Sequence, residues 1–347
     1  MNRGLALAIA VLLTAAADEA SAQVRYIDTH AHVFGFGRDR SDYAAQIAAA
    51  LATMDKLGIA RTIIAAPPQS PGLKWRQDSE ELLKAVGTHP DRFAVEAGAG
   101  SLNIMILEAV RDGRTSDALR RKFVARAEEL AHTPIVAFGE MAADHFSQAD
   151  WHPYEHAPPD HPLFLELADI AAKYDLPIDL HMEAIEHPAE LGAMHGSKKK
   201  GSRNPATLTP NIPGLERLLA HNPKTRIIWT HVGWDNTGQR TPELTKRLLA
   251  AHPNLYVAIK LAPGAPAHPP FFKRGQGVAP DWRAVIDAFP DRFMVGSDEF
   301  YFPANADRRG SPQHPGAVRI ILNSLPPDLA QRIGVDNPLK VYPRLGR

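Results

Sequence analysis

The sequence predicts an α/β fold, and two observations support this prediction. Eight short apolar segments, rich in Ile, Val and aromatic residues, recur along the 347-residue chain. Amphipathic segments lie between them, such as the one that places Ile47, Leu51 and Met54 on one helical face. The expected strands are 26–29, 61–65, 93–97, 135–139, 177–180, 226–230, 255–259 and 293–296.

Proline marks the places where a helix is expected to end before a strand begins. This pattern occurs at His89-Pro90, Leu176-Pro177, Asn222-Pro223, His252-Pro253 and Phe289-Pro290. Proline cannot continue a helix, so each of these sites sets a sharp boundary. Eight strands in strict alternation with helices close most naturally into a (β/α)8 TIM barrel, whereas a doubly wound sheet usually needs fewer units. Because no break in composition marks a second domain, we predict a single barrel domain over residues 23–347.

The first 22 residues have the features of a secretory signal peptide. Arg3 supplies a positive charge, an apolar stretch covers residues 5–17, and the small residues 20–22 match the pattern that signal peptidase accepts. An uncleaved membrane anchor is the alternative, but Asp18 and Glu19 interrupt the apolar run before a span is complete. We therefore expect cleavage and export, to the periplasm in a Gram-negative host, without stable membrane association afterwards.

Composition excludes several kinds of partner and chemistry. Lys and Arg total 39, as do Asp and Glu, so the formal net charge is zero. This balance argues against nucleic acid or an anionic membrane surface as a partner, and a small-molecule substrate is expected instead. The absence of cysteine excludes disulfides, thiolate metal ligands and a cysteine nucleophile.

Residue types that bind metals gather at the ends of the expected strands. The first strand continues into His30 and His32, which strand alternation places on the same side. In a barrel, strand ends of this kind face one mouth, where nitrogen and oxygen donors suit a divalent metal such as zinc, manganese or iron. The candidate metal ligands are His30, His32, Glu140, His181, His231 and Asp298.

Each of these residues also has a structural interpretation when taken alone. A strand-end histidine is often a hydrogen-bonded packing residue, and Gly296-Ser297-Asp298 could form a helix N-cap turn. Glu140 could cap the segment that follows it. The combination of ligand-type residues at the ends of strands one, four, five, six and eight favours one shared metal centre.

This order of residues resembles the amidohydrolase superfamily, in its amidohydrolase-related branch of metal-dependent TIM-barrel hydrolases. The resemblance extends from Tyr26 to a closing segment, 337–342, which is similar to the C-terminal helix segment of the family. It implies that His30, His32 and Asp298 bind metal. It also implies that His181 is a further ligand and that His231 is either a ligand or a substrate-facing residue.

Glu140 departs from the pattern of many binuclear members of that superfamily, which carry a carboxylated lysine at the end of the fourth strand. A glutamate takes this place in some relatives and bridges two metals, whereas other relatives of the branch work with one metal. The resemblance therefore leaves one or two ions per chain open.

The proposed ligand set implies a hydrolytic mechanism. A divalent cation lowers the pKa of a bound water from about 15.7 towards roughly 7. Asp298 would take the proton of this water and deliver it to the leaving group, and His231 would stabilise the oxyanion. We predict hydrolysis of an amide, lactone or related C–N or C–O bond. The alternatives are a metal-dependent non-oxidative decarboxylase with the same residues, and a non-catalytic exported metal- or ligand-binding barrel.

Residues after the ligand-bearing strands could recognise the substrate. The basic segment 197–203 could bind a carboxylate or phosphate or remain solvated, and Lys260 could reach a substrate carboxylate or form a salt bridge. Aromatic residues there could wall an apolar substrate or simply pack at the rim. They are Phe34, Phe36, Trp234, Phe300, Tyr301 and Phe302. The two expected insertions, 182–211 and 299–316, also follow strands.

Overall fold

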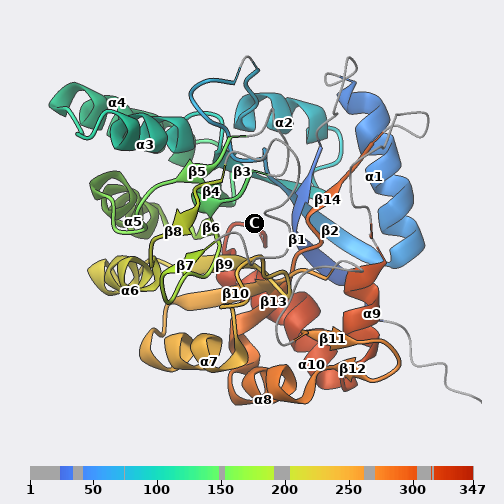
Figure 1. Cartoon of the computed structure of the whole chain (residues 1–347). Helices are drawn as coiled ribbons and strands as arrows, with labels where there is room; N and C mark the ends of the chain where they lie inside the picture. The colour runs from blue at the N-terminus through green and yellow to red at the C-terminus, as the bar shows by residue number, and fades with distance from the viewer. Residues whose placement is uncertain are drawn as a thin grey trace, which may run out of the picture.

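The computed structural model confirms the α/β fold, with a mostly parallel central sheet surrounded by helices (Figure 1). It describes residues 24–33, 42–73, 75–147, 153–190, 204–261, 270–302, 314 and 316–346. Each of the eight expected strands is present. They are β1 (Tyr26–His32), β2 (Ile59–Ile64), β3 (Phe93–Gly98), β4 (Ala137–His145), β6 (Ile178–Met182), β9 (Ile227–Val232), β10 (Leu255–Ile259) and β13 (Phe293–Val295).

Two short strands near the C-terminus, β13 and β14, lie at the two edges of the sheet. The strand order is β13-β10-β9-β6-β4-β3-β2-β1-β14, so β13 pairs with β10 while β14 (Glu299–Phe300) pairs with β1. These two short strands are consecutive in the chain, and only residues 296–298 separate them. Asp298 N donates to His30 O at 2.9 Å within this interruption. The sheet thus wraps around a common axis, although the ladder itself is interrupted at 296–298.

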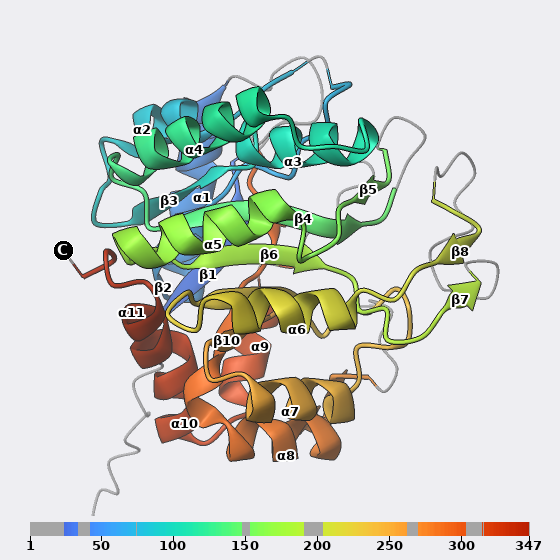
Figure 2. The ribbon, with the colours of Figure 1, turned by 90° about the vertical axis from the view of Figure 1, so that its left-hand side faces the viewer.

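Helices cover the outside of the sheet, as Figures 1 and 2 show. They are α1 (Tyr43–Leu57), α2 (Ser79–Val86), α3 (Leu102–Arg111), α4 (Asp117–Ala131), α5 (Pro162–Tyr174), α6 (Ile212–His221), α7 (Pro242–Ala251), α8 (Pro280–Ala288), α9 (Ala317–Asn323), α10 (Pro327–Gln331) and α11 (Asn337–Val341), with a 3-10 turn η2 (Pro290–Arg292) and a π-helical turn η3 (Arg332–Asp336). The prolines expected to end helices lie just beyond α2, α5, α6, α7 and α8. Proline therefore separates helix from strand at these junctions, as predicted.

Short antiparallel strands extend from the end of the sheet at which the parallel strands finish. β5 (Glu155–His156) pairs with β4, and β7 (Ala189–Glu190) pairs with β8 (Thr207–Leu208). A further hairpin joins β11 (Phe272–Lys273) to β12 (Gly277–Val278). Figure 2 shows β5, β7 and β8 at one end of the molecule and α11 with the C-terminus at the other. The carboxyl ends of the parallel strands therefore lie at one end of the molecule, and the C-terminal segment lies at the opposite end.

Two apolar layers hold the sheet in place. One fills the space between strands and helices, and includes Phe123, Phe164 and Trp282. The other lies inside the ring of strands, where Tyr342 and Leu345 of the C-terminal segment pack with strand residues. The C-terminal segment is therefore part of the core. Burial of apolar surface of this kind stabilises a fold by roughly 25 cal/mol per Å².

The predicted signal peptide lies outside the described residues, and so it stays a prediction. Among the described helices, none combines the length and apolar character needed to cross a membrane. The fourth strand differs from its prediction, because β4 continues to His145 instead of ending at Gly139. The apolar residues 141–143 and the antiparallel pairing with β5 extend it. Glu140 therefore lies within a strand and does not cap the next segment.

Candidate metal centre

The six predicted ligands come together at the carboxyl ends of the strands. Each residue lies on β1, β4, β6 or β9, or between β13 and β14. Three-residue combinations of their ligand atoms lie within 4.8 Å of one another, which is close enough to share a metal ion. The combinations are His30 with His32 and Glu140, His30 with His231 and Asp298, and Glu140 with His181 and His231.

Glu140 lies between two pairs of histidines. Its Oε2 is 3.5 Å from Nε2 of His30 and 3.7 Å from Nε2 of His32. Its Oε1 is 2.6 Å from Nδ1 of His181 and 3.1 Å from Nε2 of His231. The two carboxylate oxygens thus face different histidine pairs, which is the placement that a bridging ligand requires.

The backbone is irregular at three of the candidate ligands, Glu140, His231 and Asp298. The pairing of β4 with β6 changes register between Phe138 and Met141, around Glu140. The pairing of β9 with β10 is irregular near His231, whose φ is 65°. Residues other than glycine rarely adopt positive φ, and such conformations gather at functional sites. Asp298 also has a positive φ, 52°.

The two carboxylate oxygens of Asp298 contact different residues, a histidine and a lysine. Oδ1 lies 2.9 Å from Nε2 of His32, and Oδ2 forms an ion pair with Lys260. The Lys260 Nζ also lies 4.3 Å from the centroid of the Trp234 ring. Of the two possibilities for Lys260, the salt bridge is the one observed.

The two histidines of β1 are each held through Nδ1. His30 Nδ1 donates to Asp179 Oδ2 at 2.7 Å, and His32 Nδ1 donates to Ala65 O at 2.9 Å. Both rings therefore turn Nε2 towards the other ligands. His30 Nε2 is buried and has no hydrogen-bond partner. A buried imidazole nitrogen that lacks a partner, with its other nitrogen bonded to a carboxylate, fits a metal ligand.

Burial and neighbouring charges place most of the donors in the protonation states that a metal requires. Burial lowers the pKa of His231 to about 4. Burial and then the charge of His145 hold the pKa of His181 well below its usual value. Burial alone would raise the pKa of Glu140, but His30 and hydrogen bonds from His181 and His231 hold it well below the usual range. Neutral imidazoles and an ionised carboxylate are the forms that bind divalent cations.

Asp298 is likewise held in its ionised form. Burial alone would raise its pKa, but the charge of Lys260 and the hydrogen bond with His32 outweigh burial and keep the pKa well below the ordinary range. The Asp298 side chain is 14% exposed, compared with 1% for His30 and His32. Asp298 is thus the ionised oxygen donor of the cluster with some access to solvent.

Among the predicted rim residues that the structure describes, Trp234 and Phe300 are half-buried. Tyr301 and Phe302 are buried, which agrees with the packing alternative for these two residues. Phe300 lies against His32, with ring centroids 4.3 Å apart. Phe34, Phe36 and the basic segment 197–203 lie outside the described residues.

The sequence prediction missed several residues around the cluster. Asp179 orients His30, and strand alternation could have found it, because it lies two residues before His181 on the same side of β6. His145 also escaped notice. Its ring lies 4.3 Å from that of His181, and its Nδ1 is 3.2 Å from Oε2 of Glu155. This contact depends on the β4–β5 hairpin, for which the sequence carried no recognised signal.

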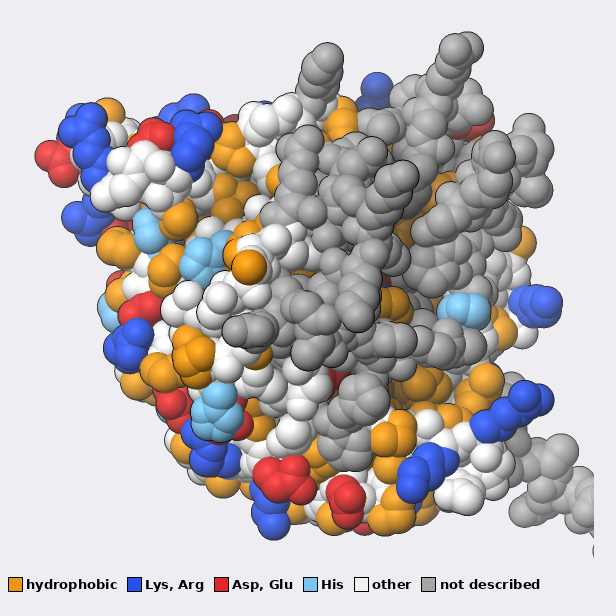
Figure 3. All heavy atoms as spheres, viewed as in Figure 1, with side chains coloured by type: hydrophobic (Ala, Val, Ile, Leu, Met, Phe, Trp, Pro, Cys, Tyr) orange, Lys and Arg blue, Asp and Glu red, His pale blue; other side chains and the backbone are white. Residues whose placement is uncertain are grey.

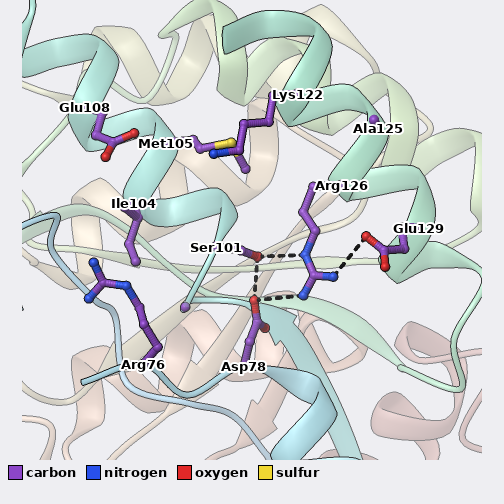
Figure 4. A pocket seen from close by; sticks show the side chains of 11 residues that line it. Arg76, Asp78, Ser101, Ile104, Met105, Glu108, Lys122, Ala125, Arg126 and Glu129 are labelled. Carbon is purple, nitrogen blue, oxygen red and sulfur yellow. Dashed lines mark hydrogen bonds and ion pairs between the residues drawn. The ribbon is translucent and has the colours of Figure 1, made fainter. Parts of the chain in front are cut away.

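A separate hollow of about 640 Å³ is formed by α3, α4 and the loops before α2 and α3. Figure 4 shows the side chains that line it. Arg126 lies on one side of it and bonds to Glu80 and Glu129. Arg76 and Lys122 are further lining residues, and the six candidate ligands do not line it. The metal cluster and this hollow are therefore different places. Charges of both signs are also interspersed across the face shown in Figure 3.

Comparison with known proteins agrees with this geometry. The sequence pattern of a family described as amidohydrolase matches residues 148–344, more than half of the chain. The chain belongs to the amidohydrolase family. The match includes His181, His231 and Asp298, whereas the three ligand candidates from β1 and β4 precede it. The family is generally metal-dependent, which agrees with the clustered His, Glu and Asp side chains.

Solved structures support the fold of this amidohydrolase. YjjV, a TatD homolog from Escherichia coli K12, is 15% identical with a TM-score of 0.50, over 92% of this chain and 98% of that one. D-hydantoinase (dihydropyrimidinase) from a Thermus species is 11% identical with a TM-score of 0.50, over 92% and 70%. These identities show the fold alone. No protein in a curated set matched the sequence.

Proposed function

We propose that this amidohydrolase is a metal-dependent hydrolase that cleaves an amide, lactone or related C–N or C–O bond with an activated water molecule. The observation that carries the proposal is the position of Glu140, whose two oxygens face His30 and His32 on one side and His181 and His231 on the other. A carboxylate placed in this way suits two adjacent divalent cations, and a pair of such ions is suited to hydrolysis.

We propose a set of ligands for each ion. His30, His32 and Asp298 would hold one cation, and His181 with His231 would hold the other, with Glu140 shared between them. Nitrogen and oxygen donors of this kind suit zinc, with manganese or iron as alternatives. A bound divalent cation supplies Lewis acidity, which makes water nucleophilic near neutral pH and polarises a carbonyl group.

In this proposal, side chains of the cluster would perform the proton transfers. Asp298 is ionised, so its Oδ1 can accept a proton from the attacking water and pass it to the leaving group. Lys260 holds the other carboxylate oxygen and thereby keeps Oδ1 directed towards His32. His231 is buried and neutral, and it would stabilise negative charge that develops on the substrate oxygen if it does not bind the second ion.

The test combines elemental analysis of the purified protein with a substrate screen. We expect zinc or a similar divalent metal, together with turnover of an amide or a lactone. The rate should rise with pH through one kinetic pKa, because hydrolysis is limited at low pH by protonation of the water or of Asp298. Release of carbon dioxide from an aromatic or unsaturated acid, with no turnover of amides, esters or lactones, would instead identify a decarboxylase. Bound metal without any turnover would favour the non-catalytic barrel.

A further inference from the structure

The hydrogen-bonded ladder between β6 and β9 ends just before these strands deliver two of the candidate ligands. Its last paired residues are Leu180 and Trp229, and His181 and His231 lie one and two residues further along. Both strands continue beyond Leu180 and Trp229, but no later residues of β6 and β9 pair with each other. The main-chain oxygens that face this gap therefore need hydrogen-bond donors from elsewhere.

Two such oxygens belong to Met182 and Thr230. Ile178 N donates to Arg226 O across the ladder at 2.9 Å. Met182 and Thr230 lie four residues further along the two strands, so strand alternation directs their oxygens to the same gap. The guanidinium of Arg240 bonds both oxygens. Its Nη1 donates to Thr230 O at 2.9 Å, and its Nη2 donates to Met182 O.

The Arg240 side chain is buried and lies over an aromatic ring. The residue is 2% exposed, and its guanidinium carbon lies 4.7 Å from the centroid of the Trp229 ring. Trp229 Nε1 also donates to Met182 O, at 2.7 Å. A guanidinium presents several donors in one rigid plane, so a single side chain bonds both strand ends and fixes their separation.

The loop between β9 and α7 brings Arg240 back to the strands, and Asp235 holds this loop. Asp235 Oδ2 accepts a hydrogen bond from Arg240 N at 3.1 Å. Asp235 Oδ1 accepts hydrogen bonds from the main-chain nitrogens of Thr237 and Gly238, both at 3.0 Å. Burial lowers the pKa of Arg240, and the negative charges of Glu183 and Asp235 oppose this effect. Arg240 is therefore held through both its main chain and its guanidinium.

Fixing the two strand-end oxygens also restricts the neighbouring histidines. A peptide unit is planar, so the bond to Thr230 O restrains the plane that includes the Cα of His231. Met182 directly follows His181. The two imidazole rings lie 4.7 Å apart between centroids, and both face Oε1 of Glu140. The guanidinium is thereby placed to set the distance between these two candidate ligands.

We infer that Arg240 is a positioning residue that holds the ends of β6 and β9 at the separation at which His181 and His231 can bind one ion. The inference rests on the proposed function, in which these two histidines hold the second cation. Arg240 is positively charged, so through charge alone it would weaken the binding of a nearby cation. Positioning has the opposite effect on metal affinity, and the sign of the change separates the two explanations.

The test measures zinc binding by the full-length protein, through competition with a chelator and through metal-to-protein ratios. We expect the wild type to hold two zinc ions. Arg240→Met keeps an apolar side chain beside Trp229 but removes every guanidinium bond. We expect its Kd for one ion to rise about 10- to 100-fold and its Kd for the other to stay within about threefold of wild type, because loss of a group that orients ligands has effects of this size. An effect through charge alone would lower the Kd instead.

A second variant covers the case in which Arg240→Met does not fold. Arg240→Lys keeps the positive charge beside Glu183 and Asp235, but its single ammonium group cannot reproduce the planar fork of donors. We expect a selective rise in the same Kd as for Arg240→Met. Unchanged binding of both ions by the variant that folds would contradict the inference.

Arg319→Met is the matched control. Arg319 is another buried arginine that donates to main-chain oxygens, those of Val24 and Leu57, and it lies 4.6 Å from the centroid of the Tyr26 ring. These contacts lie at the start of β1 and at the end of α1, away from the candidate ligands. The substitution should lower the melting temperature without changing the Kd of either zinc ion.

A further measurement identifies the ion that responds. His181→Ala removes a proposed ligand of the second ion only, so this variant should keep one ion. In the His181→Ala background, Arg240→Met should leave the Kd of the remaining ion nearly unchanged, as a double-mutant cycle detects. Weaker binding of the remaining ion would show that Arg240 supports the whole cluster and would overturn the inference.

The outcomes separate failure of the inference from failure of the proposed function. Equal zinc binding by wild type and the Arg240 variant would overturn the inference, as would equal weakening of both ions, tighter binding, or a wild type that holds a single ion. Wild-type protein that binds no divalent metal would refute the proposed function, and the inference with it, before any variant is measured. Two ions in the wild type, with one of them weakened by Arg240→Met and neither by Arg319→Met, would support both.

Discussion

Oε1 of Glu140 lies 2.6 Å from Nδ1 of His181, a contact that joins β4 to β6 at the centre of the candidate site. Because the other oxygen of Glu140 faces the histidines of β1, a single side chain connects both halves of the cluster. Substitution of Glu140 therefore tests the connection between the two histidine pairs, whereas substitution of one histidine tests a single candidate ligand.

His30 and Asp298 should be essential for metal binding and activity. They come from opposite ends of the chain, and their donor atoms, His30 Nε2 and Asp298 Oδ1, lie 3.9 Å apart. We expect His30→Ala or Asp298→Asn to reduce bound metal or activity by more than about 100-fold, since loss of a ligand exceeds loss of its supporting group. Elemental analysis and activity assays measure this, and circular dichroism should show that the barrel still folds. Full activity in a chelated, metal-free sample would contradict metal dependence.

The number of metal ions per chain should depend on Glu140. If its two oxygens bridge, the wild type should contain about two ions per chain, and Glu140→Gln should lower this number because an amide offers one oxygen instead of two. Metal-to-protein ratios after dialysis measure it. A single tightly bound ion that survives Glu140→Gln would show that the centre is mononuclear and that Glu140 only supports the ligands.

His156 should stabilise the protein more at low pH than at high pH. Its Nδ1 lies 2.7 Å from Asp144 Oδ1, and this hydrogen bond raises the pKa of His156 against the opposing effect of burial. A raised pKa in the folded state contributes stability that is complete below the unfolded value and is lost as pH rises through the folded value. The contribution is therefore present below about pH 6.5 and disappears above the raised pKa.

The measurement compares urea unfolding of wild type and His156→Gln at about pH 5.5 and about pH 9. We expect the loss of unfolding free energy to be larger at the lower pH, by no more than about 1 kcal/mol, because the side chain is 35% exposed and solvent screens the pair. His132→Gln is the control, since it removes an exposed histidine whose Nδ1 bonds the main-chain oxygen of Glu128 and whose ring lies 5.1 Å from that of Tyr174. An equal loss at both pH values would contradict the prediction.

We also propose export with cleavage after residue 22. The charged start, the apolar stretch 5–17 and the small residues 20–22 support this proposal. N-terminal sequencing of protein from the native host should find Gln23 at or near the first position. An intact Met1 in a cytoplasmic fraction would show that these residues are not a cleaved signal.

From sequence alone, we could predict where the eight parallel strands lie and which candidate ligands follow or end them. Strand alternation placed His30 and His32 on one side of β1, and proline marked the helix ends, because both signals are local properties of the backbone. The position of Asp298 just after the eighth strand followed from the same pattern. Parallel strands bring their carboxyl ends to one side, so these residues were expected to meet.

The contacts among these groups could not be predicted from sequence. Asp179 and Glu96 lie behind His30, Lys260 pairs with Asp298, and β4 continues past Glu140. These contacts depend on the register between strands that lie far apart in sequence, and irregular pairing beside Glu140 and His231 alters that register locally. Side-chain direction at such irregularities follows from packing across the whole sheet, which no local pattern of residues encodes.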